Sequence, residues 1–408
     1  MSRSSSWWLP AGVLPDARLL LWTRALRAFG DGYVSLLLPF YLTQLGFNAL
    51  QVGMIITATL LGSGAMTLGV GLIAHRYRSR SLLLAVSLLM AATGVAIASV
   101  TDFWPLFVVA FIGTLNPSAG DVSAFLPLEH ALLARATGAP TRTALFARYS
   151  WIGAFVGALG AQAAGLPDLL AVIHGVSVKE AMQGMFLLYA AFGLACFTLY
   201  RGLSPALDAP HEEKSVPLGK SRRIVYTLAA LFSLDSFAGG FAVQSLLALW
   251  LYQRFGLSLT ETGAIFFWTG IFAAFSHLVS ARIAARIGLI NTMVFTHLPS
   301  SVFLILVPLM PTLPLALLFL LLRSALSQMD VPARSSYVMA VVSPQERAAA
   351  AGVTAVPRSL AAAISPALAG YLLTLSPFGW PLVVCGALKI AYDLALLGMF
   401  RKVKPPEE

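Results

Sequence analysis

The chain has 408 residues, of which 58% are hydrophobic and only 11% are charged, and its mean hydropathy is +0.81. Because soluble domains carry about 25% charged residues, this composition excludes an ordinary water-soluble protein and indicates an integral membrane protein. A net charge of +10 can indicate nucleic-acid binding, but the positions of the charges decide between a nucleic acid and a membrane surface.

Long apolar runs, interrupted by Pro, Gly and charged residues, predict twelve membrane-spanning helices, because roughly 20 apolar residues cross the hydrocarbon core. The longest polar stretch, residues 201–223, predicts a linker between the sixth and the seventh span. The spans are predicted at residues 19–45, 49–73, 81–100, 105–132, 143–165, 184–200, 224–253, 260–284, 290–309, 313–341, 348–374 and 379–400.

The lysine and arginine residues predict the orientation of these spans, since cytoplasmic loops are enriched in both. With the N-terminus inside, the outer loops carry only Lys179 and Arg254. The other loop and terminal cations form a basic rim on the inner side, beside anionic lipid. We therefore expect a multi-pass protein of the cytoplasmic (inner) membrane, with both termini in the cytoplasm and no binding of nucleic acid.

The second half of the chain repeats the first at an offset of 210 residues. Polar residues and glycines coincide at this offset. Matches between apolar residues alone would not establish the repeat, because they also occur by chance in so apolar a chain. Because each half has six spans, an even number, both halves insert the same way up and are related by an axis along the membrane normal. The matched pairs include Gly30 and Gly240, Ser35 and Ser245, Gly53 and Gly263, Arg76 and Arg286, Arg148 and Arg358, and Gly160 and Gly370.

The predicted fold is an all-α polytopic membrane protein in which a pseudo-twofold axis relates two six-helix bundles. Its two cysteines, Cys196 and Cys385, fall inside apolar runs and are expected to be buried hydrophobic residues. The segments are a cytoplasmic N-terminal segment (1–18), the first bundle (19–200), a cytoplasmic linker (201–223), the second bundle (224–400) and a cytoplasmic tail (401–408).

A basic loop joins spans two and three, with the sequence GLIAHRYRSRSLLL at Gly71–Leu84, and residues 281–291 hold a fainter copy, ARIAARIGLIN. The loop resembles the signature loop of the major facilitator superfamily, although a histidine replaces the acidic residue of that pattern. The resemblance implies a gating loop, while anchoring at the anionic membrane surface explains its charges equally well. The gating-loop residues are Gly71, His75, Arg76, Arg80 and Arg286.

The stretch Asp330–Gly370 is similar to spans ten and eleven of twelve-helix, drug-exporter-like members of this superfamily, which are of the proton antiporter type. The resemblance implies a secondary transporter that alternates access by rocking two halves about a midplane site. It favours proton-coupled efflux of a small organic or amphipathic compound, with import or uniport of a small metabolite or ion as the alternative. Span four lacks the arginine, and span five the Gly-Pro pair, of many proton-coupled exporters.

Other classes of function lack their motifs in this sequence. There is no complete phosphate-binding loop of the pattern Gly-x-x-x-x-Gly-Lys-Ser/Thr, no Gly-x-Ser-x-Gly and no His-Glu-x-x-His. We therefore expect a transporter rather than an enzyme, with no cofactor and no metal, and a membrane sensor or lipid-acting enzyme is a distant alternative. The expected partners are a small-molecule substrate, protons and the lipid bilayer, and the protein is expected to be a monomer.

Ionisable residues inside spans are functional candidates, because they are costly in the hydrocarbon region. In the first span, Arg24, Arg27 and Asp31 share one helical face. Asp31 is the first candidate for a coupling or substrate group, since it lies in mid-span between two glycines. The alternative is a structural pair in which Arg27 neutralises Asp31.

Polar residues in spans four and seven add candidates for the substrate cavity. The repeat register places Asp235 level with Arg24 and Arg27, so we expect it to meet one of them across the two halves when the cytoplasmic side closes. Asn116 and Gln244 are uncharged and are expected to form hydrogen bonds with a solute.

Two charge pairs occupy matching positions in the repeats: Asp121 with Arg148, and Asp330 with Arg358. Duplication favours a bracing role between neighbouring spans over direct binding of a substrate, because one ligand cannot meet both halves identically.

Span ten also carries a stripe of Arg323, Asp330 and Arg334, in which the last two are spaced for an intrahelical pair. Lys389 and Asp393 of the last span have the same spacing and are expected to neutralise each other.

Glu129 and His130 lack ionisable counterparts in the second half. We expect them to be solvated at the cytoplasmic end of span four, and a proton relay is the alternative. His277 and His297 lack a second ligand at metal spacing, so they are expected to be packed histidines rather than metal ligands.

Overall fold

A computed structural model of the chain describes residues 13–73, 77–118, 123–137, 139–204, 207, 218–219, 221–343 and 346–401. Every regular element in these ranges is a helix. The helices are α1 (Asp16–Gln44), α2 (Ala49–Ile73), α3 (Ser79–Ser99), α4 (Phe103–Ile112), α5 (Phe125–Arg135), α6 (Ala139–Ala163), α7 (Leu166–His174), α8 (Val178–Arg201), α9 (Arg222–Gly240), α10 (Gln244–Phe255), α11 (Leu259–Ile287), α12 (Leu289–Leu309), α13 (Leu313–Leu326), α14 (Asp330–Ala340), α15 (Arg347–Leu375) and α16 (Trp380–Phe400).

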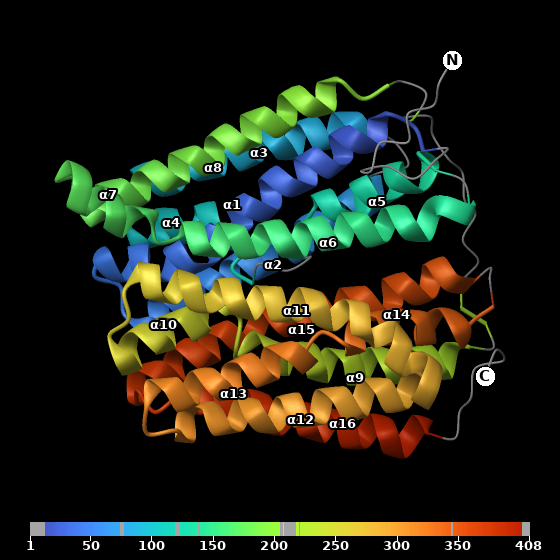
Figure 1. Cartoon of the computed structure of the whole chain (residues 1–408). Coiled ribbons are helices and arrows are strands. Elements are labelled where there is room, and N and C mark those ends of the chain that lie inside the picture. Colours follow the sequence, from blue (N-terminus) through green and yellow to red (C-terminus); the bar gives the residue numbers. More distant parts are fainter. Residues whose placement is uncertain are drawn as a thin grey trace.

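The helices run along a common direction and form two halves, α1–α8 and α9–α16, which lie one above the other in Figure 1. Helix α1 begins and helix α16 ends at the same end of the bundle, at the right of Figure 1. We call this the terminal end, and we call the end that carries the short helix α7 the opposite end.

The twelve predicted spans are all present, and the all-α fold of two six-span bundles is confirmed. Spans four, seven and ten are helix pairs, namely α4–α5, α9–α10 and α13–α14, whereas the sequence predicted unbroken helices there. In the described part of the chain, nine helices or helix pairs are long and apolar enough to cross a membrane, judged by length and composition.

The break in span four has a local cause. Asn116 Oδ1 accepts a hydrogen bond from the backbone N–H of Ser118 at 3.2 Å, and Pro117 between them has no N–H with which to continue a helix. In span seven, α9 ends at Gly240 and α10 begins at Gln244. Irregular backbone at membrane depth is tolerated where protein or a cavity surrounds it, so these breaks point to the interior of the bundle.

The two halves meet through two helix pairs that the internal repeat relates to each other. Helix α2 packs against α15, and α11, the counterpart of α2, packs against α6, the counterpart of α15. A Cβ atom at Gly53 would lie 2.5 Å from the carbonyl oxygen of Pro366, and one at Gly263 would lie 2.7 Å from that of Ala161. Both glycines therefore permit a backbone approach that a larger residue would block.

The close contacts between the halves lie toward the opposite end. There, the Ser245 hydroxyl donates a hydrogen bond to the backbone carbonyl of Ser35, its repeat counterpart. Toward the terminal end, a Cβ atom at Gly69 of α2 or at Gly352 of α15 would meet nothing within 4 Å. The structure is therefore closed at the opposite end, and its halves separate toward the terminal end.

Candidate functional site

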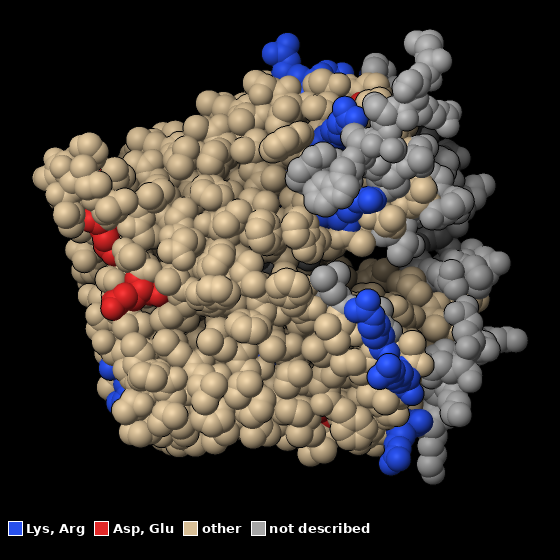
Figure 2. All heavy atoms as spheres, viewed as in Figure 1, with Lys and Arg blue, Asp and Glu red and all other residues tan. Residues whose placement is uncertain are grey.

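A cavity of about 420 Å³ lies between the halves, and the second half supplies most of its walls. The described residues of the first half contribute Leu60 and Ser118 to the lining. Figure 2 shows a recess between the halves on the side where Lys and Arg side chains gather. The charged residues that line the cavity are Asp235, Arg323, Arg334, Arg358 and Lys389.

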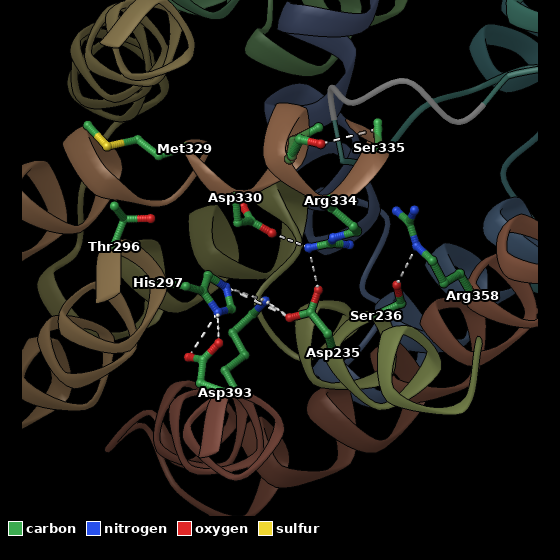
Figure 3. A network of polar contacts seen from close by, with 12 residues as sticks. Asp235, Ser236, Thr296, His297, Met329, Asp330, Arg334, Ser335, Arg358 and Asp393 are labelled. Atoms are coloured by element: carbon green, nitrogen blue, oxygen red, sulfur yellow. Dashed lines mark hydrogen bonds and ion pairs between the residues drawn. The ribbon is translucent and has the colours of Figure 1, made fainter. Parts of the chain in front are cut away.

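Asp235 is the central acid of this site (Figure 3). Its Oδ1 accepts a hydrogen bond from Lys389 Nζ at 2.7 Å, and its Oδ2 accepts one from Arg334 Nη2 at 3.0 Å. Arg334 also pairs with Asp330, which lies one turn earlier on α14. All four side chains are almost fully removed from solvent. Asp235 is thus held by two cations from α14 and α16, so neither of its oxygens is left without a charged partner.

A histidine–carboxylate pair extends this network away from the cavity. His297 Nδ1 lies 2.9 Å from Asp393 Oδ1, and Lys389 Nζ donates to His297 Nε2 at 3.3 Å. Because Asp393 accepts and Lys389 donates, the contacts fit the tautomer with its proton on Nδ1. His297 and Lys389 also line a second cavity of about 190 Å³. The network therefore connects α12 and α16 to the wall of the main cavity.

The cavity wall carries more positive than negative charge. Asp235 and Asp330 offset Lys389 and Arg334. Arg358 Nε donates to the Ser236 hydroxyl at 3.2 Å, and no described carboxylate lies within 4.0 Å of Arg323 or Arg358. Arg323 and Arg358 therefore face the cavity as cations without a carboxylate partner among the described residues.

The first half holds a separate buried charge cluster around Glu129 of α5. Arg27 Nη2 and the Tyr149 hydroxyl both donate to Glu129 Oε2. The hydroxyl groups of Tyr200 and Thr23 donate to Oε1 at 2.6 and 2.8 Å. Both members of the Arg27–Glu129 ion pair are nearly inaccessible to solvent. This cluster ties α1, α5, α6 and α8 together.

One prediction about these charges is wrong, and another concerns a different conformation. Glu129 is fully buried rather than solvated at the end of its span, because α1, α6 and α8 supply the four donors around it. Asp235 meets Arg334 and Lys389 of its own half in this conformation. Its contact with Arg24 or Arg27 is expected when the cytoplasmic side closes, and it stays a prediction for that state. Arg24 instead lies over the ring of Tyr149, 5.0 Å from its centroid.

The pairings predicted within the second half also need correction. Asp330 pairs with Arg334, as its spacing predicted, but Arg358 contacts Ser236, so the structure does not show the expected Asp330–Arg358 brace. Lys389 and Asp393 do not neutralise each other directly. They bind Asp235 and His297 respectively, because these partners project from the neighbouring helices α9 and α12.

The uncharged candidates and Asp31 are distributed around the site. Gln244 lines the main cavity. Asn116 is buried beside it and accepts a hydrogen bond from the Ser118 hydroxyl at 2.9 Å. Asp31 is half-buried in the middle of α1 and is not among the described residues that line the cavity. His130 is half-buried, with its ring centroid 5.3 Å from that of Tyr149.

Several predicted residues lie near or beyond the limits of the described ranges. Asp121, His75 and Arg76 lie outside the described residues, so neither the Asp121–Arg148 brace nor the centre of the gating loop is seen. Arg148 is half-buried on α6. The other gating-loop residues lie at the terminal end: Gly71 on α2, Arg286 exposed on α11, and Arg80, which donates to the carbonyl of Arg201 at 2.6 Å.

Sequence reasoning did not assign Lys389 and His297 to the site. The sequence predicts a pair between Lys389 and Asp393 of the same helix and a packed side chain for His297. Both are ionisable residues inside spans. Because an ionisable group is costly in the hydrocarbon region, their position alone marks them as candidates for the site. Among the described residues, no group of three or more metal-binding side chains forms.

The sequence and the fold resemble those of known membrane transporters. Residues 20–327 and 229–408 match the Major Facilitator Superfamily. Over 94% of each chain, the protein is 25% identical to the uncharacterized membrane protein YJR124C of Saccharomyces cerevisiae.

Solved structures show the same fold. One is a bacterial homolog of the human lysosomal transporter Spinster in an inward-facing, unoccupied conformation. It is 14% identical in sequence, the match covers 96% of this chain and 98% of that chain, and the TM-score is 0.71. Another is the nucleoside transporter NupG, with 16% identity, 96% and 100% covered, and a TM-score of 0.71. From the match to the family along the chain, this protein belongs to the Major Facilitator Superfamily and is a transporter rather than an enzyme.

Proposed function

We propose that this secondary transporter exports a small organic solute in exchange for protons, and that the solute binds in the cavity between its halves. The observation that carries the proposal is the position of that cavity, at the helix breaks between the two repeat-related halves. Its volume of about 420 Å³ lies within the range of small-molecule sites, about 300–1,000 Å³. Discontinuous helices at such an interface are a recurrent way of building a transporter site.

The proposed orientation rests on the basic rim. The Lys and Arg side chains at the terminal end in Figure 2 support a cytoplasmic location for that end, by the positive-inside rule. With this orientation, the cavity is accessible from the cytoplasm and the opposite end is closed. This is the state in which an exporter loads its solute. Export itself is the direction that the resemblance to drug-exporter-like members favours.

Two groups are proposed as the proton carrier. Asp31, in the middle of α1, is the candidate that the sequence provides. The structure adds the His297–Asp393 pair, which is buried and reaches the cavity through Lys389 and Asp235. Carboxylate and histidine chains inside spans are typical of proton relays. A change in the charge on His297 or Asp393 would be felt at Lys389, and therefore at the cavity wall.

The test is solute flux in liposomes that contain only the purified protein, measured with and without an imposed pH gradient. We expect solute to accumulate against its gradient only when protons can flow in the opposite direction. Solute flux that is the same with and without the pH gradient would indicate a uniporter. Co-directional movement of solute and protons would establish an importer, and no flux of any solute would reject the proposed function.

Substitutions then separate the two proton carriers. If Asp31 carries the proton, Asp31→Asn abolishes gradient-driven flux and spares solute exchange. If the histidine pair carries it, Asp393→Asn has that effect instead. Asp102→Asn is the matched control, because Asp102 is exposed in a loop and its side chain caps no helix. If the pH dependence of solute flux is unchanged in a variant, the substituted residue is not the proton carrier.

A further inference from the structure

We infer that the transported solute is a small organic anion, and that Arg323 and Arg358 bind its carboxylate, phosphate or sulfonate group. This inference rests on the proposed function, since it assigns a substrate class to the same cavity. Its basis is the distribution of charge along the cavity wall, which Figure 3 shows in part.

The cations of the wall fall into two groups. Arg334 and Lys389 are bound by Asp330 and Asp235, at N–O distances that satisfy both charges. Arg323 and Arg358 line the same cavity without a carboxylate within 4.0 Å among the described residues. The wall therefore carries an excess of positive charge that the described side chains do not offset.

A guanidinium group inside a span needs a counter-charge or access to water, because the hydrocarbon region provides neither. Arg323 and Arg358 project from α13 and α15, and both line the same cavity. A guanidinium group binds carboxylate or phosphate through two parallel hydrogen bonds. An anionic solute would therefore supply the counter-charge that the protein itself does not place there.

The same wall disfavours cationic solutes. Asp235 is the acidic residue among the described lining residues, and Lys389 and Arg334 already occupy its two oxygens. An amine entering the cavity would have to displace one of these cations and leave it buried without a partner, which is strongly unfavourable. Polar groups beside Arg323, such as Gln328 and Ser300, line the second cavity and could bind further oxygens of an anion.

The first experiment uses matched pairs of probes on the purified full-length chain. Benzoate and benzamide, nicotinate and nicotinamide, and glycerol 3-phosphate and glycerol differ mainly in charge, and benzylamine provides a cation. Ligands that bind the native state raise its melting temperature. We expect only the anionic members of each pair to raise the melting temperature. In Arg323→Gln and Arg358→Gln, their affinity should fall about 10- to 100-fold, because each variant loses a charge-assisted hydrogen bond. Arg254→Gln, an exposed site outside the cavity, should bind like the wild type.

The second experiment needs no ligand. If Arg323 is an uncompensated cation held for an anion, Arg323→Gln should leave the melting temperature of the ligand-free protein unchanged or raise it. A structural arginine would instead lower it on substitution. A lower melting temperature in this variant, equal shifts by acids and amides, or a panel in which no anion responds would each overturn the inference.

The outcomes also separate this inference from the proposed function. If neutral or cationic probes bind and cross liposome membranes while anions do neither, the transporter proposal stands and the anion site is rejected. If anions bind in the Arg323-dependent way but no solute crosses the membrane, the site stands and the transport proposal is rejected.

Discussion

Ser245 donates a hydrogen bond to the backbone carbonyl of Ser35, and the two residues are counterparts in the internal repeat. Two equivalent positions can touch only where the axis that relates them passes, so this contact marks the pseudo-twofold axis. The Ser245 hydroxyl also donates to the carbonyl of Pro117, in the break of span four, at 2.9 Å. The closed end of the molecule is therefore built around its symmetry axis, directly beside the cavity.

Gly53→Ala and Gly263→Ala should each disfavour the conformation that is closed at the opposite end. The added methyl group would come within 2.7 Å of a carbonyl oxygen on the facing helix, and overpacking of this kind costs about 1–3 kcal/mol. We expect populations to move toward a state that is closed at the terminal end. Spin labels at Leu72→Cys and Ala351→Cys, two exposed positions in different halves near the terminal end, should report shorter distances.

Gly69→Ala is the matched control on the same helix, because its Cβ atom would meet nothing within 4 Å. The natural cysteines are buried and should not take up label. Identical distance distributions in Gly53→Ala and Gly69→Ala would show that the glycine contact does not set the conformation.

Glu129→Gln should strongly destabilise the first half. The substitution leaves the Arg27 guanidinium buried without its carboxylate, and breaking a buried ion pair by removing one partner costs about 3–5 kcal/mol. Replacing both residues, as in Arg27→Met with Glu129→Gln, should cost less than the sum of the single changes. Unfolding of the purified variants in detergent measures these free energies, and additive costs would contradict the buried pair.

Asp235 and Lys389 should be energetically coupled, whereas Asp235 and Arg24 should not be. A double-mutant cycle with Asp235→Asn and Lys389→Met should give an interaction energy of about 0.5–3 kcal/mol, because the two groups are in contact. The parallel cycle with Arg24→Gln should be additive to within about 0.5 kcal/mol. Coupling of Asp235 to Arg24 but not to Lys389 would contradict the observed pair and support the predicted contact between the halves.

Glu346 should make stability depend on pH in the acid range. The backbone N–H of Gly219, followed by the Ser221 hydroxyl, lowers the pKa of this loop carboxyl. Since the folded-state pKa lies below the unfolded value of about 4.3, the carboxylate stabilises the fold above that pH. This contribution is lost as the pH falls through the folded-state pKa.

The measurement is the melting temperature of wild type and Glu346→Gln between pH 7 and pH 3. We expect the wild type to be more stable at neutral pH, and the difference to shrink as the pH falls below the unfolded-state pKa. A difference that stays constant over this range would show that the hydrogen bonds of Glu346 do not depend on its charge.

The sequence contains enough information for the fold but not for the charge partners. Apolar runs and the 210-residue repeat predict the twelve spans, because each span needs a fixed length of apolar chain. The repeat also relates Ser35 to Ser245. It identifies equivalent positions, however, and not contacts, so it aligned Asp235 with the arginines of α1 although its partners project from α14 and α16.

Contacts between distant spans limited the prediction of the site. Glu129 and Arg27 are 102 residues apart, and neither helical spacing nor the repeat brings them together. The sequence also does not predict the breaks in spans four, seven and ten, because the apolar composition continues through them although the helix is interrupted. The in-span location of Lys389 and His297 was visible in the sequence, but their partners depend on how α9, α12 and α16 pack.

The most direct test of the central claim is to block the cavity and measure transport. Ser236 lines the cavity beside Arg358, so Ser236→Cys places a single reactive thiol there while the natural cysteines remain buried. After reaction with a bulky maleimide, liposomes containing this variant should lose solute flux, whereas wild type treated in the same way should keep it. Undiminished flux through a variant that mass spectrometry shows to be fully labelled would contradict passage through this cavity.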